Sequence, residues 1–498
     1  MRGPAVAGDL RLESFRLQAR RLLVPGGFAA LFLIAGVHTL NRAWSKDAFL
    51  HLAVVCALRD DLTSPGHPLV VSDGEYACYR PYAVLQGVLS RVLSLEPVEV
   101  LVRSGLVNTV LLGLAAGVLV RGFGGNRTTA LLLLVFTLLL WGVTPWRWSG
   151  FLSANSFGFG LPYPCAFATA TAWACIGQWT AYLDGGPRRS LAVATGLGAL
   201  AVLTHPFTGA WLALALACVL AAQRSWTRAR TLSILAAAGT GAVTVLAWPG
   251  LAWPGLAWPY YDVLGLLAGS SAFTDVHPLL YGNAPERLVL LTVTLPALLA
   301  RFQRGRRDPL ALMFVSAGAV YAWGWLSQTW SLGRVLPLLV LAGHLALALE
   351  VARWRRSSTI TTAVVVACVL GAVGSAAGLA RGVPQALQPD ALRARSTAVQ
   401  LSELQPLADQ IGATDVVAAS RIFSERLPAI TGLTYRALPT PGCQIWSRGT
   451  GPTRRCSALR PPPSFAFSCA WTSMRTLRCW APRSQWLAAW SLARSSGC

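Results

Sequence analysis

Long apolar runs alternate with short arginine-rich segments and with longer polar segments along most of the chain. A run of about 17 to 25 apolar residues is long enough to cross a hydrocarbon core of about 30 Å as a helix. The pattern predicts eleven such runs, centred on residues 22–40, 104–120, 128–144, 164–182, 190–204, 207–222, 231–248, 287–300, 309–327, 335–351 and 359–379. We therefore expect an all-α polytopic membrane protein with about 11 transmembrane helices.

The distribution of arginine predicts how these helices are oriented. Arginines occur in the N-terminal segment, residues 1–21, and in alternate connections, for example at Arg121, Arg188, Arg301 and Arg353. All of them fall on one side if the N-terminus is cytoplasmic, as the positive-inside bias requires. No convincing small-residue cleavage site follows the first apolar run, so we expect an uncleaved helix and not a signal peptide. The expected location is the plasma (inner) membrane, with an extracytoplasmic C-terminus.

Composition agrees with this class. The chain is 54% hydrophobic and only 12% charged, whereas soluble domains carry roughly a quarter charged residues. Its formal net charge of +22 would suggest nucleic acid in a soluble protein. Here most arginines lie in connections between apolar runs and set topology, so the expected surroundings are membrane lipids and no nucleic acid.

Composition also divides the chain into segments. A transmembrane domain, residues 22–381, contains a long first outer loop, residues 41–99. Residues 382–442 combine a helical spacing of apolar residues with two short strand-like stretches, and predict a small α/β extracytoplasmic segment. The tail, residues 443–498, has eight arginines, no acid and five of the eleven cysteines. It is either a basic outer appendage or a coding region translated out of frame.

The repeat "LAWPGLAWPGLAWPYY" begins at Leu246. Because proline and glycine interrupt helices, we expect the seventh span to end there and a loop to follow. In the first outer loop, Cys56 and Cys78 could form a disulfide in an oxidising compartment, or both could stay reduced.

The first outer loop opens with "KDAFLHLAVVCALRDD", which places Asp47 and His51 four residues apart. On a helix these side chains share one face, and the apolar spacing predicts a helix lying along the membrane surface with one apolar side. A carboxylate so placed could act as general base towards a hydroxyl group. In the alternative interpretation Asp47 caps the helix and His51 is an interfacial side chain.

A short N-terminus, a first span, an acid-led helix "KDAFLHLAVVCALRDDLTSPGHP" and many later spans resemble the C-type superfamily of polytopic membrane glycosyltransferases, which includes mannosyl- and arabinosyltransferases. The resemblance implies a polyprenyl-phosphate sugar donor, and it implies that Asp47 is a catalytic base or a metal-binding acid. The segment "DVVAASRIFSERLPAITGLTYRALP" also resembles an outer segment of large bacterial members. The continuation expected for them is missing after Gly442.

Arginines on the outer side are candidates for binding a lipid phosphate. Arg334 precedes the tenth span and resembles the late-span arginine that contacts the lipid phosphate in this superfamily, and its planar fork suits a phosphate. Its alternative role is that of an interfacial arginine extending towards water. Arg147, in "TPWRWSGF", and Arg80, in "YACYRPY", lie among aromatic residues that either stack on sugar rings or anchor spans.

Four further polar positions could complete the site. His205, in a tight turn between two spans, either lines a cavity or is satisfied within its turn. Asp73 and Glu75 could bind a metal or sugar hydroxyls, or be solvated turn residues. His277, with Asp262 and Asp275, is a weaker candidate. No His/Cys/Asp/Glu cluster has a recognised metal-ligand spacing, so no metal site is assigned, although a divalent metal is compatible with the resemblance.

These observations lead to the hypothesis of a bacterial glycosyltransferase that moves a sugar from a polyprenyl phosphate to a glycan, lipid or protein acceptor on the outer face of the cell envelope. Asp47 and His51 are the expected catalytic residues, and Arg334, His205, Arg80, Arg147, Asp73 and Glu75 the expected substrate-binding residues. The alternative is a non-catalytic carrier or export protein for envelope lipids or glycans.

Overall fold

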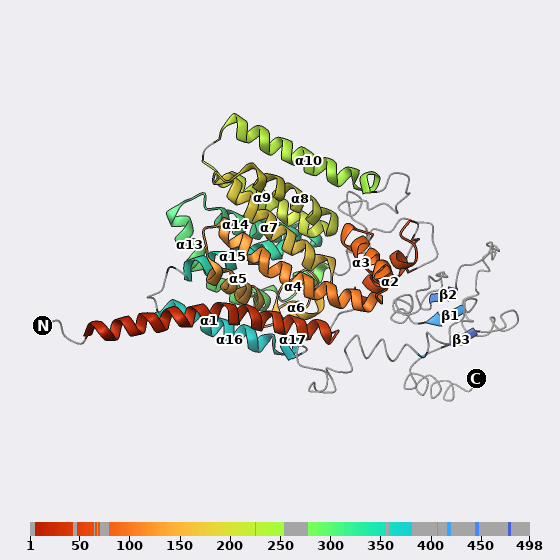
Figure 1. The fold of residues 1–498 in the computed structure, drawn as a ribbon, viewed down its shortest axis with the longest axis horizontal. Helices are drawn as coiled ribbons and strands as arrows, with labels where there is room; N and C mark the ends of the chain where they lie inside the picture. Colours follow the sequence, from red (N-terminus) through yellow and green to blue (C-terminus); the bar gives the residue numbers. More distant parts are fainter. Residues whose placement is uncertain are drawn as a thin grey trace.

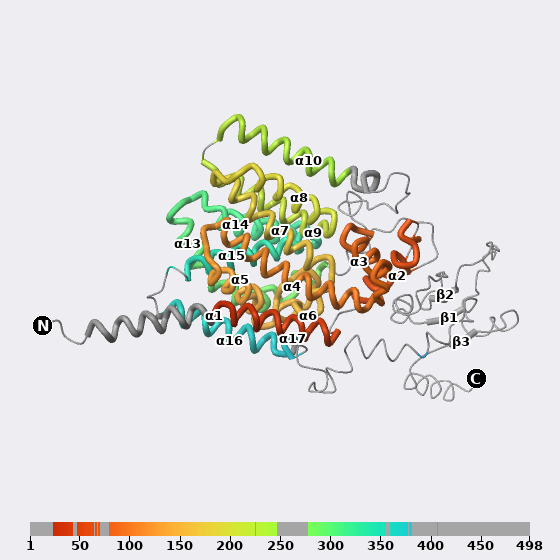
Figure 2. Tube along the Cα trace, viewed as in Figure 1, coloured from red at the N-terminus to blue at the C-terminus, as the bar shows by residue number. Residues whose placement is uncertain are grey.

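The computed structural model describes most of the helical part of the chain (Figure 2). The described ranges are residues 5–42, 47–63, 65–66, 68–69, 79–224, 226–252, 277–351, 353 and 358–380, with residue 406 and three short strands. Side chains are described from Leu23 onwards in the first helix and up to residue 246 in α10.

Five helices of the described residues are long and apolar enough to cross a membrane: Leu23–Leu40, Pro97–Gly122, Arg228–Leu246, Pro309–Leu326 and Trp330–Val351. They belong to α1 (Ala5–Leu40), α4 (Pro97–Gly122), α10 (Arg228–Ala252), α14 (Pro309–Leu326) and α15 (Leu336–Val351), which η4 (Trp330–Val335) precedes. Three shorter apolar helices are also present. A multi-helix membrane architecture is therefore supported, whereas the count of eleven stays a prediction.

The remaining helices mostly surround or connect these spans (Figure 1). They are α2 (Asp47–Asp60), α3 (Pro81–Val92), α5 (Arg127–Leu139), α6 (Ala154–Gly160), α7 (Pro164–Leu183), α8 (Arg188–Thr204), α9 (Pro206–Ala222), η2 (His277–Leu280), α12 (Ala284–Leu288), η3 (Val289–Thr294), α13 (Leu295–Arg304), α16 (Ser358–Gly374) and α17 (Ala376–Ala380). Several begin directly at a proline, as in α3, α4, α7, α9 and α14. Proline suits the first helical position because its missing N–H has no partner there anyway.

The centre of the helical body is formed by α7 and α15, whose residues are buried on nearly all sides. α7 crosses α4 at two glycines. An ideal Cβ on Gly122 would lie 2.6 Å from the carbonyl oxygen of Gly177, and one on Gly177 would lie 2.6 Å from that of Val118. Small residues allow two helix backbones to approach this closely.

The predicted third span, residues 128–144, is wrong as a continuous helix, because α5 ends at Leu139. Gly142 and Pro145 follow within six residues, and both residue types disfavour the continuation of a helix. Other elements satisfy the released backbone groups: His344 Nε2 lies 3.0 Å from the carbonyl oxygen of Leu140, and Leu291 donates its backbone N–H to Trp141 at 3.2 Å. The span predicted at 287–300 is likewise divided, between α12, η3 and α13.

A buried ionic cluster joins α13, α14 and α15. Glu350 is 1% exposed and forms ion pairs with Arg301 at 3.4 Å, with Arg353 at 3.3 Å, and with Arg304. Arg301 also pairs with Asp308 at 2.8 Å, and Asp308 caps α14 by accepting from the backbone N–H groups of its first turn. A carboxylate inside a membrane protein requires such cationic partners.

Two helix ends differ in extent from the predicted spans. α10 continues through Pro249 to Ala252, past the predicted break, because a proline near the end of a helix removes only one late hydrogen bond. α1 begins at Ala5, so the first helix extends into the N-terminal segment, residues 1–21, whose cytoplasmic location stays a prediction.

Three short strands lie in the C-terminal part: β1 (Val416–Ala419), β2 (Gln444–Ser447) and β3 (Leu477–Cys479). They form one sheet of order β2-β1-β3, with β1 antiparallel to β2 and parallel to β3. β1 coincides with a predicted strand. The predicted helix and the second predicted strand lie outside the described residues, so the α/β segment stays a prediction.

Candidate functional site

The helix that carries Asp47 and His51 is present, as predicted. α2 begins at Asp47, whose exposed carboxylate lies in the first turn, where the helix dipole favours a negative charge. The expectation of a single apolar side is wrong, because residues around the whole helix are buried, among them Phe49, Leu52 and Val54. His51 packs against Tyr163, at the start of α7, with ring centroids 4.7 Å apart.

The turn between α8 and α9 forms a second part of the site. Arg80 Nη1 donates to the carbonyl oxygen of Thr204 at 3.0 Å, and this contact joins the first outer loop to the end of α8. His205 Nδ1 caps α9 by accepting from the backbone N–H of Thr208 at 3.3 Å, and it lies 2.9 Å from the Thr208 hydroxyl. Because Nδ1 is an acceptor here, the ring proton of neutral His205 lies on Nε2.

Arg334 lies at the entrance to α15, in η4, and is held on all sides. Its Nε donates to His277 Nε2 at 3.1 Å, and its Nη1 donates to the carbonyl oxygen of Ser149 at 3.3 Å. The guanidinium carbon also lies 4.9 Å from the ring centroid of Trp148 and 4.8 Å from that of Phe207. These contacts hold the guanidinium against protein groups and two aromatic rings, and its role in binding a phosphate stays a prediction.

The segment that carries Trp148 and Ser149 is irregular, and α6 holds it in place. Ser156 Oγ donates to the carbonyl oxygen of Trp146 at 2.7 Å and accepts from the backbone N–H of Trp148 at 2.9 Å. Asn155 Nδ2 donates to the carbonyl oxygen of Pro145 at 2.9 Å. Short polar side chains at the start of α6 therefore fix the position of the carbonyl that Arg334 binds.

Burial and nearby cations keep the histidines of the site neutral. Burial, aided by the charge of Arg80, lowers the pKa of His51 to about 3. Burial, aided by Arg334, lowers the pKa of His277 to about 4. The pKa of His205 lies well below its usual value because of burial first and of Arg80 and Arg334 next. Near neutral pH all three rings are hydrogen-bonding groups without charge.

The structure brings five predicted site residues together. Asp47 is close enough to act electrostatically on Arg334, and His205 is within the same range of His51, Arg80 and Arg334. The five come from α2, the start of α3, the α8–α9 turn and η4. Within the described part of this cluster, two cations face one anion, which is an arrangement suited to an anionic ligand.

The other predicted residues are placed differently. Arg147 is exposed, and its guanidinium carbon lies 5.1 Å from the ring centroid of Phe159. Asp73, Glu75 and Cys78 lie outside the described residues, as do Asp262 and Asp275.

No protein-family model matches the sequence, and no curated protein matches it. The solved structures that it resembles in fold include those of the Archaeoglobus fulgidus oligosaccharyltransferase, in a form tethered to an acceptor peptide through a disulfide bond and in the apo form. The first has a TM-score of 0.45 and 12% identity, and the match covers 83% of this chain and 63% of that one. The second has a TM-score of 0.44 and 12% identity, with coverages of 82% and 64%. The chain therefore spans less than two thirds of these proteins, and a similarity of this size assigns no activity to it.

Sequence reasoning ranked His277 low and did not single out Trp148, Phe207 or Tyr163. Aromatic residues at membrane boundaries are common as anchors, so their sequence offered no signal that they surround Arg334 and His51. Across the ranges that the structure describes, no group of three or more His, Cys, Asp or Glu residues could hold a metal ion.

Proposed function

We propose that this chain is a membrane glycosyltransferase that moves a sugar from a polyprenyl-phosphate donor to a glycan, lipid or protein acceptor at the outer face of a bacterial plasma membrane. The observation that carries the proposal is the cluster of Arg80 and Arg334 with Asp47 and two neutral histidines, His51 and His205. The two arginines can bind a phosphate, the carboxylate can accept a proton, and the two neutral rings can form hydrogen bonds with hydroxyl groups.

Arg334 is the proposed phosphate-binding residue. A guanidinium has five N–H donors, and two of the donors of Arg334 contact His277 and Ser149. The others can bind phosphate oxygens while those contacts and the two stacked rings keep the group in place. A pre-positioned cation stabilises the negative charge that develops on a departing phosphate.

Asp47 is the proposed general base. Its carboxylate accepts the proton of the attacking acceptor group, whose lone pair forms the new bond to the anomeric carbon. The bond from that carbon to the phosphate oxygen breaks, and the phosphate leaves with the bonding electrons, towards Arg334 and Arg80. Attack from the face opposite the leaving group inverts the anomeric configuration. His51 and His205, which are uncharged near neutral pH, orient the acceptor and sugar hydroxyls through hydrogen bonds.

The test is envelope glycan composition in a deletion strain complemented with wild-type protein, with Asp47→Asn, or with the matched control Asp60→Asn, at equal membrane expression. Asp60 is an exposed acid at the other end of the same helix. One sugar linkage should vanish on deletion and return with wild type and with Asp60→Asn. Asp47→Asn should leave the linkage at least 100-fold reduced, because general-base catalysis contributes roughly 10²–10⁴-fold.

A second comparison tests the phosphate site. Arg334→Gln should fail to restore the linkage, whereas Arg91→Gln, which changes an exposed arginine at the end of α3, should restore it. Full restoration by both Asp47→Asn and Arg334→Gln would contradict the transferase proposal and favour a non-catalytic carrier.

A further inference from the structure

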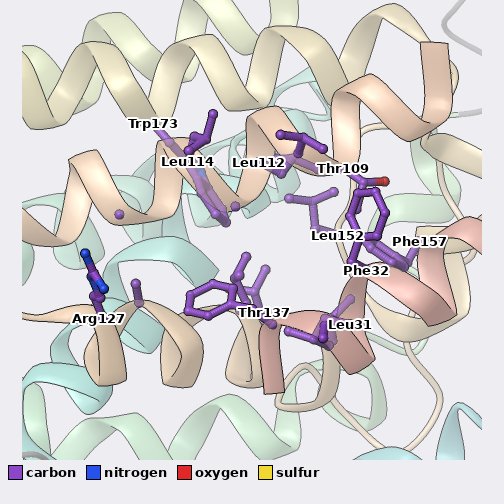
Figure 3. Close-up of a pocket in the computed structure, with 18 of the residues that line it drawn as sticks. Leu31, Phe32, Thr109, Leu112, Leu114, Arg127, Thr137, Leu152, Phe157 and Trp173 are labelled. Carbon is purple, nitrogen blue, oxygen red and sulfur yellow. The ribbon is translucent and has the colours of Figure 1, made fainter. Parts of the chain in front are cut away.

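A long apolar groove lies between α1, α4 and α5, away from the residues of the candidate site. Its volume is about 800 Å³, and its walls are aliphatic and aromatic side chains such as Phe28, Leu112 and Leu134. Figure 3 shows Leu112, Leu114 and Trp173 along one side and Leu31 and Thr137 along the other.

The groove opens towards the lipid. Leu114 is 62% exposed, Val110 45% and Phe32 44%, although each lies on a helix that is a candidate span. In a bilayer, such side chains contact acyl chains, so the groove is a place where a lipid chain gains contacts on several sides at once.

One end of the groove is basic. Arg121, Asn126 and Arg127 line it where α4 passes into α5, and Figure 3 places Arg127 at the end opposite Phe32 and Phe157. Both arginines are exposed, and Arg121 Nε lies 3.3 Å from the carbonyl oxygen of Gly117. Their guanidinium groups can therefore reach a ligand at the mouth of the groove.

The length of the groove matches a single leaflet. Arg127 and Thr137 both line it and are separated by ten residues of α5, which is about 15 Å at 1.5 Å per residue. Half of a hydrocarbon core is also about 15 Å. An occupant with acyl chains of one leaflet and a charged group at the boundary fits these dimensions.

We propose that the groove is a binding site for a phospholipid with an anionic headgroup, whose acyl chains lie along α4 and α5 and whose phosphate contacts Arg121 and Arg127. The charge of the two arginines argues for an anionic lipid and against a zwitterionic one. This role is independent of the proposed transferase activity, because none of the groove residues belongs to the candidate site.

The experiment uses the full chain, purified in a neutral detergent and titrated with phosphatidylglycerol or phosphatidylcholine of identical acyl chains. Bound lipid is counted by native mass spectrometry. Wild type should bind phosphatidylglycerol more tightly than phosphatidylcholine. R121Q/R127Q should bind phosphatidylglycerol about 30-fold more weakly than wild type, which corresponds to about 1 kcal/mol for each arginine. The matched control is R188Q/R189Q, two exposed arginines at the start of α8.

A second pair of variants tests the apolar part. An ideal Cβ on Gly117 meets nothing within 4 Å, so Gly117→Leu extends into the groove without a backbone clash and should weaken both lipids. Gly196→Leu, at an equally open position on α8, should weaken neither. Equal affinity of wild type for the two lipids, or an equal loss in R188Q/R189Q, would overturn the proposal.

Discussion

Replacement of Gly177 by alanine tests how closely α4 and α7 must approach. The added Cβ would lie 2.6 Å from the carbonyl oxygen of Val118 and 2.8 Å from Cα of Leu119. Both are backbone atoms, so the helices must move apart by about 1 Å to reach ordinary contact distance. Such overpacking costs about 1–3 kcal/mol, and alanine recovers about 0.5–1 kcal/mol through its helix propensity. We expect the free energy of unfolding to fall by about 1–2 kcal/mol.

The assay is thermal unfolding of the purified protein in one detergent, with Gly196→Ala as the control. At Gly196 a Cβ meets nothing within 4 Å, so the control should be as stable as wild type or slightly more stable. Gly177→Ala should lower Tm by a few degrees. If both variants had the same Tm, the α4–α7 crossing would not be as close as described.

Three further predictions concern charge and capping. Because the pKa of His51 is about 3 in the fold and 6.5 ordinarily, the unfolded chain binds more protons between these values, so stability falls as pH falls through that window. His51→Gln should lower the slope of the unfolding free energy against pH by up to about 1.4 kcal/mol per pH unit there, which is measured as a weaker dependence of Tm on pH. Glu350→Gln removes the partner of three arginines and should cost roughly 3 kcal/mol in chemical unfolding, whereas Glu96→Gln, at a side chain 76% exposed, should change little. His205→Ala should cost about 1 kcal/mol by removing the α9 cap, and His205→Asn should restore most of it in the same thermal assay.

Local features of the fold could be predicted from the sequence because they depend on neighbouring residues. The apolar runs located long helices such as α1, α4, α7, α14 and α15, and the apolar spacing behind Asp47 predicted α2, whereas no run predicted α3 or α6. The break of α5 could not be predicted in the same way. The Leu140 carbonyl just past that break is contacted by His344, which is 204 residues away in the chain.

The candidate site shows the same division. Arg334 and His205 were predicted as site residues from residue type and position, but the residues that they contact were not. Arg334 contacts His277, 57 residues away, and Ser149, 185 residues away. Aromatic residues such as Trp148 have the same sequence signature whether they anchor a span or enclose a cation, so only tertiary packing distinguishes the two.

The contacts of Arg334 have a consequence for the order in which the protein is made. The ribosome synthesises Asp47, His51 and Arg80 well before Arg334. The carbonyl group of Ser149 therefore has no contact with Arg334 until that residue has been synthesised. A nascent chain that ends before η4 would have the proposed base without the guanidinium that faces it. If the proposed roles hold, partly synthesised chains would lack the phosphate-binding group of the site, and this group would be added only after α14 has been synthesised.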